Sequence, residues 1–172
     1  MNSKLPLGAL LLALSGCVDY EVCTSHYADG PAMSVRYYQG GVAHRPWVIF
    51  THDKRERAVT NYEQGARDGA WRTLGRISML FQREYEDDQP AGKWTRYWAD
   101  GSLQEQGTFR DGLKSGTWRR WLPTGDLIEQ AEFSEGVYDG RVQRWSAAGD
   151  LEFDKLYARG ARVVPPKSGS DQ

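Results

Sequence analysis

Glycine, aromatic and polar positions recur in a fixed order along the second half of this chain. The segments 92–97, 116–121 and 140–145 each begin with glycine and end with an aromatic residue, and successive segments are offset by 24 residues. The same offset relates three further sets: Gly101, Gly125 and Gly149; Leu103, Leu127 and Leu151; Gly112, Gly136 and Gly160. No stretch keeps a helical period, because glycines interrupt each candidate. A period of this size predicts a stack of repeated structural units.

Each unit is predicted to be a β-hairpin. Asp100-Gly101 has the composition of a two-residue type I′ turn, which needs positive φ at both positions. Side chains on one face then oppose each other in four pairs: Trp98 with Leu103, Arg96 with Glu105, Trp94 with Gly107, and Gly92 with Phe109. A turn at Thr124-Gly125 likewise pairs Leu122 with Leu127, Arg120 with Glu129, Trp118 with Ala131, and Gly116 with Phe133. A turn at Ala148-Gly149 pairs Arg144 with Phe153. Large rings therefore tend to face glycine or alanine.

The repeat extends back into the first half of the chain with more variation. Six units are expected within residues 21–162, with later units starting at residues 45, 69, 92, 116 and 140. The third unit has 23 residues, and we expect a longer or bulged turn between Gly75 and Phe81. The predicted fold is all-β, an elongated antiparallel meander of about twelve strands built from these hairpins. Residues 163–172 do not repeat and are expected to form a flexible tail.

The first residues have the layout of a secretory signal. An apolar run from Leu5 to Leu14 is too short to span a bilayer, and Leu14-Ser15-Gly16-Cys17 follows it directly. These four residues resemble the bacterial lipobox, whose cysteine is lipid-modified. We expect residues 1–16 to be a lipoprotein signal peptide, Cys17 to carry the lipid, and residues 17–20 to link it to the repeats. Val18, where aspartate would resemble a retention signal, favours the periplasmic face of the outer membrane. The alternative is an ordinary cleaved signal.

Charge and residue types limit the possible functions. Without residues 1–16 the chain loses Lys4 alone, which leaves 21 basic against 23 acidic residues and argues against a nucleic-acid partner. The three histidines His26, His44 and His52 have no zinc-ligand spacing, and no nucleophile or phosphate-binding motif is present. We therefore expect no enzyme activity, cofactor or metal. Cys23 is either a packed residue or an odd thiol available for intermolecular pairing.

The repeat resembles a known family. Residues 109–118 and 133–140 carry an aromatic residue, Gly-x-x-x-Gly and, in the first case, Gly-x-Trp, as in the MORN-variant repeats of bacterial proteins described as YwqK-type antitoxins. The first three units depart from this pattern, with Arg45 in place of a repeat glycine and Lys54 in place of a turn glycine. The resemblance implies an elongated antiparallel sheet that binds proteins or, in some members, lipids, and it implies no catalytic mechanism.

Two rows of side chains are candidate binding surfaces. The first contains aromatic rings and arginines that share one face: Trp94, Arg96, Trp98, Phe109, Trp118, Arg120, Phe133 and Arg144. A second aromatic row, Tyr97, Trp121 and Trp145, is predicted on the opposite face. A single-layer sheet cannot bury both rows, so at least one should be exposed or covered by a partner. We expect an envelope lipoprotein that binds a periplasmic protein, with an antitoxin or immunity-type inhibitor as the narrower form. The alternatives are a module that binds cell-wall glycan and a protein that binds phospholipid.

Overall fold

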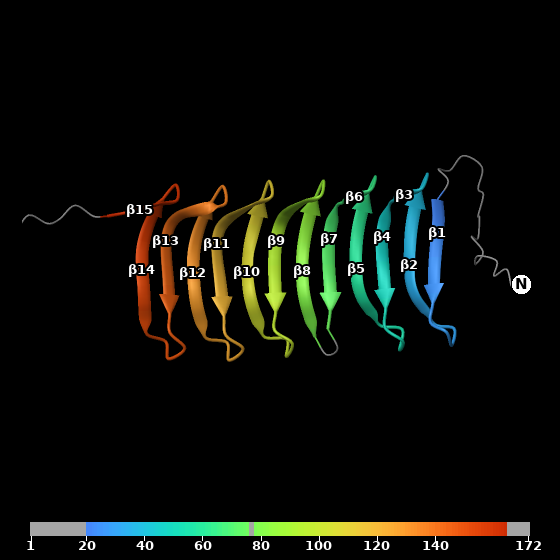
Figure 1. The fold of residues 1–172 in the computed structure, drawn as a ribbon, viewed down its shortest axis with the longest axis horizontal. Coiled ribbons are helices and arrows are strands. Elements are labelled where there is room, and N and C mark those ends of the chain that lie inside the picture. The colour runs from blue at the N-terminus through green and yellow to red at the C-terminus, as the bar shows by residue number, and fades with distance from the viewer. Residues whose placement is uncertain (1–19, 76–77, 165–172) are drawn as a thin grey trace, which may run out of the picture.

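The protein folds into one open antiparallel β-sheet. The computed structural model describes residues 20–75 and 78–164, and in this part of the chain successive strands lie side by side along the length of the sheet (Figure 1). The strands are β1 (Tyr20–His26), β2 (Ala32–Gln39), β3 (Val42–Ala43), β4 (Arg45–Phe50), β5 (Glu56–Glu63), β6 (Ala66–Arg67), β7 (Gly69–Leu74), β8 (Met79–Glu86), β9 (Gln89–Tyr97), β10 (Leu103–Arg110), β11 (Leu113–Trp121), β12 (Leu127–Ser134), β13 (Val137–Trp145), β14 (Leu151–Ala158) and β15 (Ala161–Val163). The predicted all-β meander is confirmed. Twelve of the fifteen strands are the expected ones, and β3, β6 and β15 are short additions at the turns.

The sheet is a single layer, so its core is thin. Within the described residues the long strands pair in the order of the sequence from β1 to β14, with β15 after β14, while the short strands β3 and β6 pair only with β2 and β5. The buried apolar side chains in this part of the chain are correspondingly few: Val59, Tyr85, Trp118, Ala131 and Val142. Stability therefore comes from contacts between neighbouring strands, as in other repeat proteins.

The turns at the bottom of Figure 1 differ from the predicted type. The Trp98 N–H donates to the Ser102 carbonyl (2.8 Å), and the Gly101 N–H donates to the Trp98 carbonyl (3.0 Å). Gly101 has φ 93° whereas Asp100 has negative φ, so this is a three-residue loop that ends in a left-handed glycine. Hydrogen bonds from the Ser102 hydroxyl and then its backbone N–H hold the pKa of Asp100 below its usual range. The prediction of a type I′ turn here was wrong.

The extra loop residue changes the pairing nearest these turns. Tyr97, rather than Trp98, faces Leu103. In the next unit Trp121, rather than Leu122, faces Leu127. A bulge next to each turn then restores the predicted register. All the other predicted pairs are confirmed: Arg96 with Glu105, Trp94 with Gly107, Gly92 with Phe109, Arg120 with Glu129, Trp118 with Ala131, Gly116 with Phe133, and Arg144 with Phe153.

The third unit is shortened at the same kind of turn. The Gly75 N–H donates to the Ser78 carbonyl (2.6 Å), a separation of three residues where Trp98 and Ser102 are separated by four. The connection is therefore not longer than in the other units, whereas the bulge, the other form expected between Gly75 and Phe81, is present. The strands on either side keep the bulge found in the other units, between Thr73 and Leu74. This single missing position accounts for the 23-residue length of the unit.

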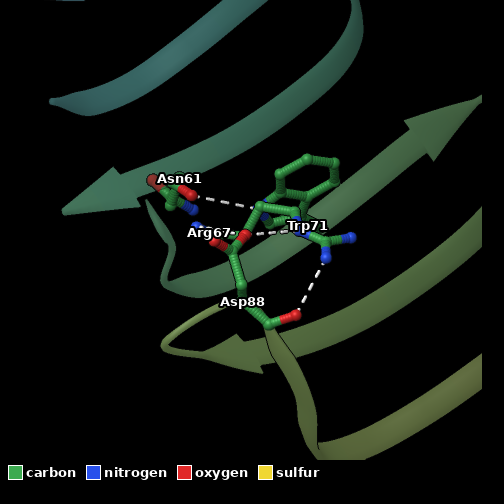
Figure 2. Close-up of polar contacts among 4 residues, drawn as sticks. All are labelled: Asn61, Arg67, Trp71 and Asp88. Carbon is green, nitrogen blue, oxygen red and sulfur yellow. Dashed lines mark hydrogen bonds and ion pairs between the residues drawn. The ribbon is translucent and has the colours of Figure 1, made fainter. Parts of the chain in front are cut away.

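Type I′ turns connect the strands at their other ends, at the top of Figure 1. Asp111 and Gly112 have φ values of 49° and 75°, and Asp87 and Asp88 have 45° and 66°. A backbone N–H in each turn donates to the preceding unit, as Asp88 does to the Arg67 carbonyl (3.0 Å). The Arg67 N–H and Nε–H both donate to Asp88 Oδ1, at 3.0 and 2.8 Å (Figure 2). The side-chain hydrogen bond from Arg67 holds the pKa of Asp88 below its usual range and raises the pKa of Arg67.

Candidate functional site

Aromatic rings run along one face of the sheet in two ladders. The first ladder is Tyr38, Trp47, Tyr62, Trp71 and Tyr85, with successive ring centroids between 4.7 and 5.5 Å apart. The second is Trp94, Phe109, Trp118, Phe133, Tyr138 and Tyr157, with centroids between 4.8 and 6.3 Å apart. We call this side of the sheet the aromatic face. Rings at such distances in tilted or edge-to-face orientation stabilise one another beyond the area that they bury.

Hydrogen bonds orient the indole rings on this face. The Trp71 Nε1–H donates to the Asn61 carbonyl (3.0 Å; Figure 2), and the Trp118 Nε1–H donates to the Thr108 carbonyl (3.2 Å). Each acceptor lies ten residues earlier, on the preceding hairpin. A β-carbon on Gly107 would clash with the Trp118 ring, so this glycine provides the space in which the indole lies. The ring therefore covers the neighbouring unit and not its own.

Cationic side chains cover several rings. Lys114 Nζ lies 3.8 Å from the centroid of the Trp118 ring and 5.3 Å from that of Phe133. Arg67 lies 4.5 Å over Tyr85. Such cation–π contacts leave the charge exposed while the ring is protected from water. Trp118 is accordingly only 4 % exposed and acts as a core residue of the sheet.

A patch with unmatched positive charge lies where the second ladder begins, at Trp94. Arg83 lies 4.5 Å over the Phe81 ring and 4.6 Å over the Trp94 ring, and Arg96 lies 5.3 Å over Phe81. Neither arginine has an ion-pair partner among the described residues. Glu105, which faces Arg96 across β9 and β10, instead forms an ion pair with Lys114 at 3.7 Å. We call these four residues, Phe81, Arg83, Trp94 and Arg96, the Arg83–Arg96 patch.

Buried hydrogen-bond donors of this patch also lack partners. Arg83 Nε and Trp94 Nε1 are both buried, and neither has an acceptor within the described chain. The equivalent indole nitrogens of Trp71 and Trp118 do have acceptors. Two guanidinium groups beside aromatic rings can bind a carboxylate or another planar anion through paired N–H donors.

The next unit has a similar set of charges, but they are internally matched. Arg120 donates to Glu129, and Arg144 Nε lies 3.8 Å from the same carboxylate. Arg120 and Glu129 line a hollow of about 240 Å³ together with Trp118 and Phe133. Because each cation here has a nearby anion, this hollow attracts a charged ligand less strongly than the Arg83–Arg96 patch does.

The predicted binding residues are brought together only in part. Trp94, Phe109, Trp118 and Phe133 belong to the second ladder, while Arg96, Arg120 and Arg144 are exposed beside it. Trp98 lies outside the ladder, and its Nε1–H donates to the Trp121 carbonyl (3.2 Å). Tyr97, Trp121 and Trp145 are half-buried near the three-residue loops, and strand alternation places them on the opposite face.

Sequence reasoning missed Phe81, Arg83 and Lys114. Arg83 occupies the position that is Gly107 in the following unit, so counting back 24 residues from Gly107 would have identified a large cation where the repeat has a small residue. Phe81 stands similarly where the following unit has Glu105, and this replacement removes one carboxylate from the neighbourhood of Arg96. The irregular third unit concealed both differences.

Metal-ligating residues do not cluster in the part of the chain that the structure describes. No group of three or more His, Cys, Asp and Glu side chains is close enough to hold a metal ion there. His52 Nε2 instead lies 2.5 Å from Asp29 Oδ2, and His44 Nδ1 lies 3.6 Å from Glu63 Oε1. Cys17 lies outside the described residues.

Comparison with known proteins adds no relative to this description. No family model matches the chain, and a search of curated proteins finds no match. Between residues 20 and 164, apart from 76–77, no helix is long and apolar enough to cross a membrane.

Proposed function

We propose that this protein is a non-enzymatic lipoprotein of the cell envelope whose aromatic face binds a protein partner. The partner presents an acidic side chain to the Arg83–Arg96 patch, and the flanking rings contact apolar groups around it. An immunity-type inhibitor that neutralises a toxin in the periplasm is the narrower form of this function.

The observation that carries the proposal is the unmatched charge of the Arg83–Arg96 patch. Arg96 is exposed and Arg83 lies between two rings, and no carboxylate of the described chain forms an ion pair with either. Guanidinium groups beside aromatic rings are typical of the residues that dominate protein interfaces. The open sheet presents them on a surface that no second layer covers within the described chain.

The glycan and phospholipid alternatives have less support. A sugar-binding surface needs ring faces that are open to solvent, whereas these rings pack against one another and under cations such as Lys114. A formal net charge of −1 opposes attraction to an anionic lipid surface.

The test is crosslinking and affinity purification of the full-length protein from cells that produce it, with partners identified by mass spectrometry. Arg96→Gln removes one charge of the patch and leaves a shorter, uncharged polar side chain. Loss of a charge-assisted hydrogen bond, about 1.5–3 kcal/mol, should lower recovery of the partner on the order of tenfold or more. Arg119→Gln is the matched control, because Arg119 lies on the opposite face, where it donates to Gln130 (2.8 Å).

Two outcomes would contradict the proposal. Equal recovery of the partner with both variants would show that the aromatic face is not the binding surface. Recovery of wall fragments or phospholipid without a stoichiometric protein would favour one of the alternatives.

The lipid anchor is tested separately by cell fractionation. Cys17→Ser removes the proposed site of lipid attachment, so the protein should move from the membrane fraction to the soluble periplasmic fraction. Cys23→Ser, which alters the other cysteine, should leave the protein with the membrane. Persistent membrane association of the Cys17→Ser protein would exclude an anchor at this residue.

A further inference from the structure

The sheet has an unpaired edge at β1. Within the described residues β1 pairs with β2 alone, and its other side is the end of the sheet (Figure 1). The Tyr37 carbonyl accepts from the His44 N–H (3.0 Å), so the backbone groups of Tyr37 point toward β4 and those of Arg36 toward β1. Cys23 pairs with Arg36, and its own N–H and C=O therefore point inward. Backbone groups alternate in direction along a strand, so the N–H and C=O groups of Tyr20, Val22, Thr24 and His26 point outward, away from β2.

The two ends of the sheet differ in how they are protected. At the far end β14 carries Glu152, Asp154 and Lys155, and β15 covers its last residues. Charges and short covering strands are the devices by which proteins prevent edge-to-edge association. β1 has the sequence Tyr-Glu-Val-Cys-Thr-Ser-His, with no lysine, arginine or proline. This edge is therefore the one suited to accept another strand.

The sequence of β1 is complementary to itself. Cys23 is the middle residue of seven, so a two-fold axis at Cys23 pairs every residue of the strand with one in a second, antiparallel copy. Val22 then faces Thr24 of the second copy, and Glu21 faces Ser25, so no like charges oppose each other. Among the described residues, a centre shifted to Val22 or Thr24 would pair fewer positions of β1.

We propose that two copies of this chain associate through their β1 strands, centred on Cys23, to form one continuous sheet. The outward groups of Val22 pair with those of Thr24 of the second copy, and each such pair forms two hydrogen bonds. Directly opposite residues share a face of a sheet, so the aromatic faces of both copies lie on the same side. The association does not depend on the partner proposed above.

The register gives the pairing a chemical signature. Because the backbone groups of Cys23 point inward, the two Cys23 residues form a non-hydrogen-bonded pair with Cα atoms about 4.5 Å apart. This separation is within the range that a disulfide spans, and the Cys23 thiol is exposed. With oxidised glutathione as the oxidant, one Cys23 thiolate forms a mixed disulfide and releases one glutathione. The second Cys23 thiolate then displaces the other glutathione, so two thiols and one glutathione disulfide give one protein disulfide and two glutathione thiols.

The first experiment treats membranes that contain the full-length protein with oxidised glutathione and examines them by non-reducing electrophoresis. The expected result is a shift to twice the monomer mass that reductant reverses and that Cys23→Ser abolishes. Absence of a dimer would overturn the proposal. A disulfide to a different protein would also overturn it, since the edge would then bind another partner.

A second experiment distinguishes ordered pairing from random collision. In the Cys23→Ser background, chains with Glu21→Cys and differently tagged chains with Ser25→Cys are produced together and oxidised. The register predicts the mixed dimer and little of either self-dimer, whereas collision would give all three species. Thr24→Pro removes an outward N–H and should lower wild-type Cys23 crosslinking at least about tenfold while the sheet still folds, because proline is tolerated on the open side of an edge strand. Unchanged crosslinking in a folded Thr24→Pro protein would contradict the proposal.

Discussion

At the scale of single residues, certain positions of the repeat have positive φ angles, and some of these positions have lost their glycine in the first half of the chain. The unit starts Gly92, Gly116 and Gly140 have φ values of 59°, 68° and 123°. Arg45 occupies the same position with φ 62°, and Lys54 occupies a loop position where later units have glycine. A left-handed conformation costs a non-glycine residue about 1–2 kcal/mol. Arg45 has an offsetting contact, because its guanidinium lies 4.1 Å over the Tyr20 ring.

The contact between Arg67 and Asp88 predicts a pH dependence. Because its pKa is lowered in the folded protein, Asp88 stabilises the fold above the unfolded aspartate pKa of about 3.9, and this contribution is lost as the pH falls through the lower folded pKa. Asp88→Asn keeps a residue that tolerates positive φ but removes the charge. The urea concentration at the midpoint of unfolding should be lower for the Asp88→Asn protein than for the wild type at pH 7. The two midpoints should converge in acid.

The control for this measurement is Asp87→Asn in the same turn. Asp87 also has positive φ (45°), so Asp87→Asn makes the same substitution in a similar backbone conformation. It leaves the Asp88 carboxylate, which accepts the hydrogen bonds of Arg67, in place. A midpoint difference for Asp88→Asn that stays constant from pH 7 into acid would show that the charge of Asp88 is not its cause.

At the scale of elements, each hairpin depends on its neighbours for burial. The Trp118 ring of β11 covers Gly107 of β10, which belongs to the preceding hairpin, and hydrogen-bonds to the Thr108 carbonyl there. The type I′ turns are joined in the same direction, as when the Gly136 N–H donates to the Lys114 carbonyl (3.0 Å). An isolated two-stranded hairpin is at best marginally stable in water, and here its main ring would have no surface to cover.

At the scale of the whole molecule, these nearest-neighbour contacts make the sheet modular. Deleting residues 92–115 joins Ala91 to Gly116 and brings Trp118 and Arg120 to the positions of Trp94 and Arg96. The shortened protein should fold, because the new interface contains the same residue types. Circular dichroism should retain its β signal, and small-angle scattering should show a sheet shorter by about 10 Å, the width of two strands.

A half-unit deletion is the matched control. Removing residues 92–103 takes away most of β9 and the loop after it, so every later type I′ turn would fall at the end of the sheet that the three-residue loops occupy. The Gly112 N–H would then be separated from the Pro90 carbonyl to which it donates. This variant should lose stability or solubility. Unfolding of the 92–115 deletion to the same extent would show that the sheet depends on contacts beyond adjacent strands.

The repeat period and the alternation of side chains were sufficient to predict the all-β meander and most of its register. These features are local, since a 24-residue offset and a period of two determine which residues share a face. The sequence also identified four rings of the second ladder, Trp94, Phe109, Trp118 and Phe133, and the arginines Arg96, Arg120 and Arg144, because these repeat with the unit. It did not identify Tyr138 and Tyr157.

The tertiary structure alone decided the turn types, the ring partners and the charge balance of the patch. Asp-Gly fits both a two-residue and a three-residue turn, and the difference is one hydrogen bond between Trp98 and Ser102. Trp118 faces Ala131 within its hairpin, yet its ring turns to the other neighbouring strand, where Gly107 leaves space. Glu105 faces Arg96 but pairs with Lys114, and Phe81 flanks Arg96 on its other side. In each case a side chain can interact with the strand on either side of it. The sequence of one hairpin includes only one of these two neighbouring strands.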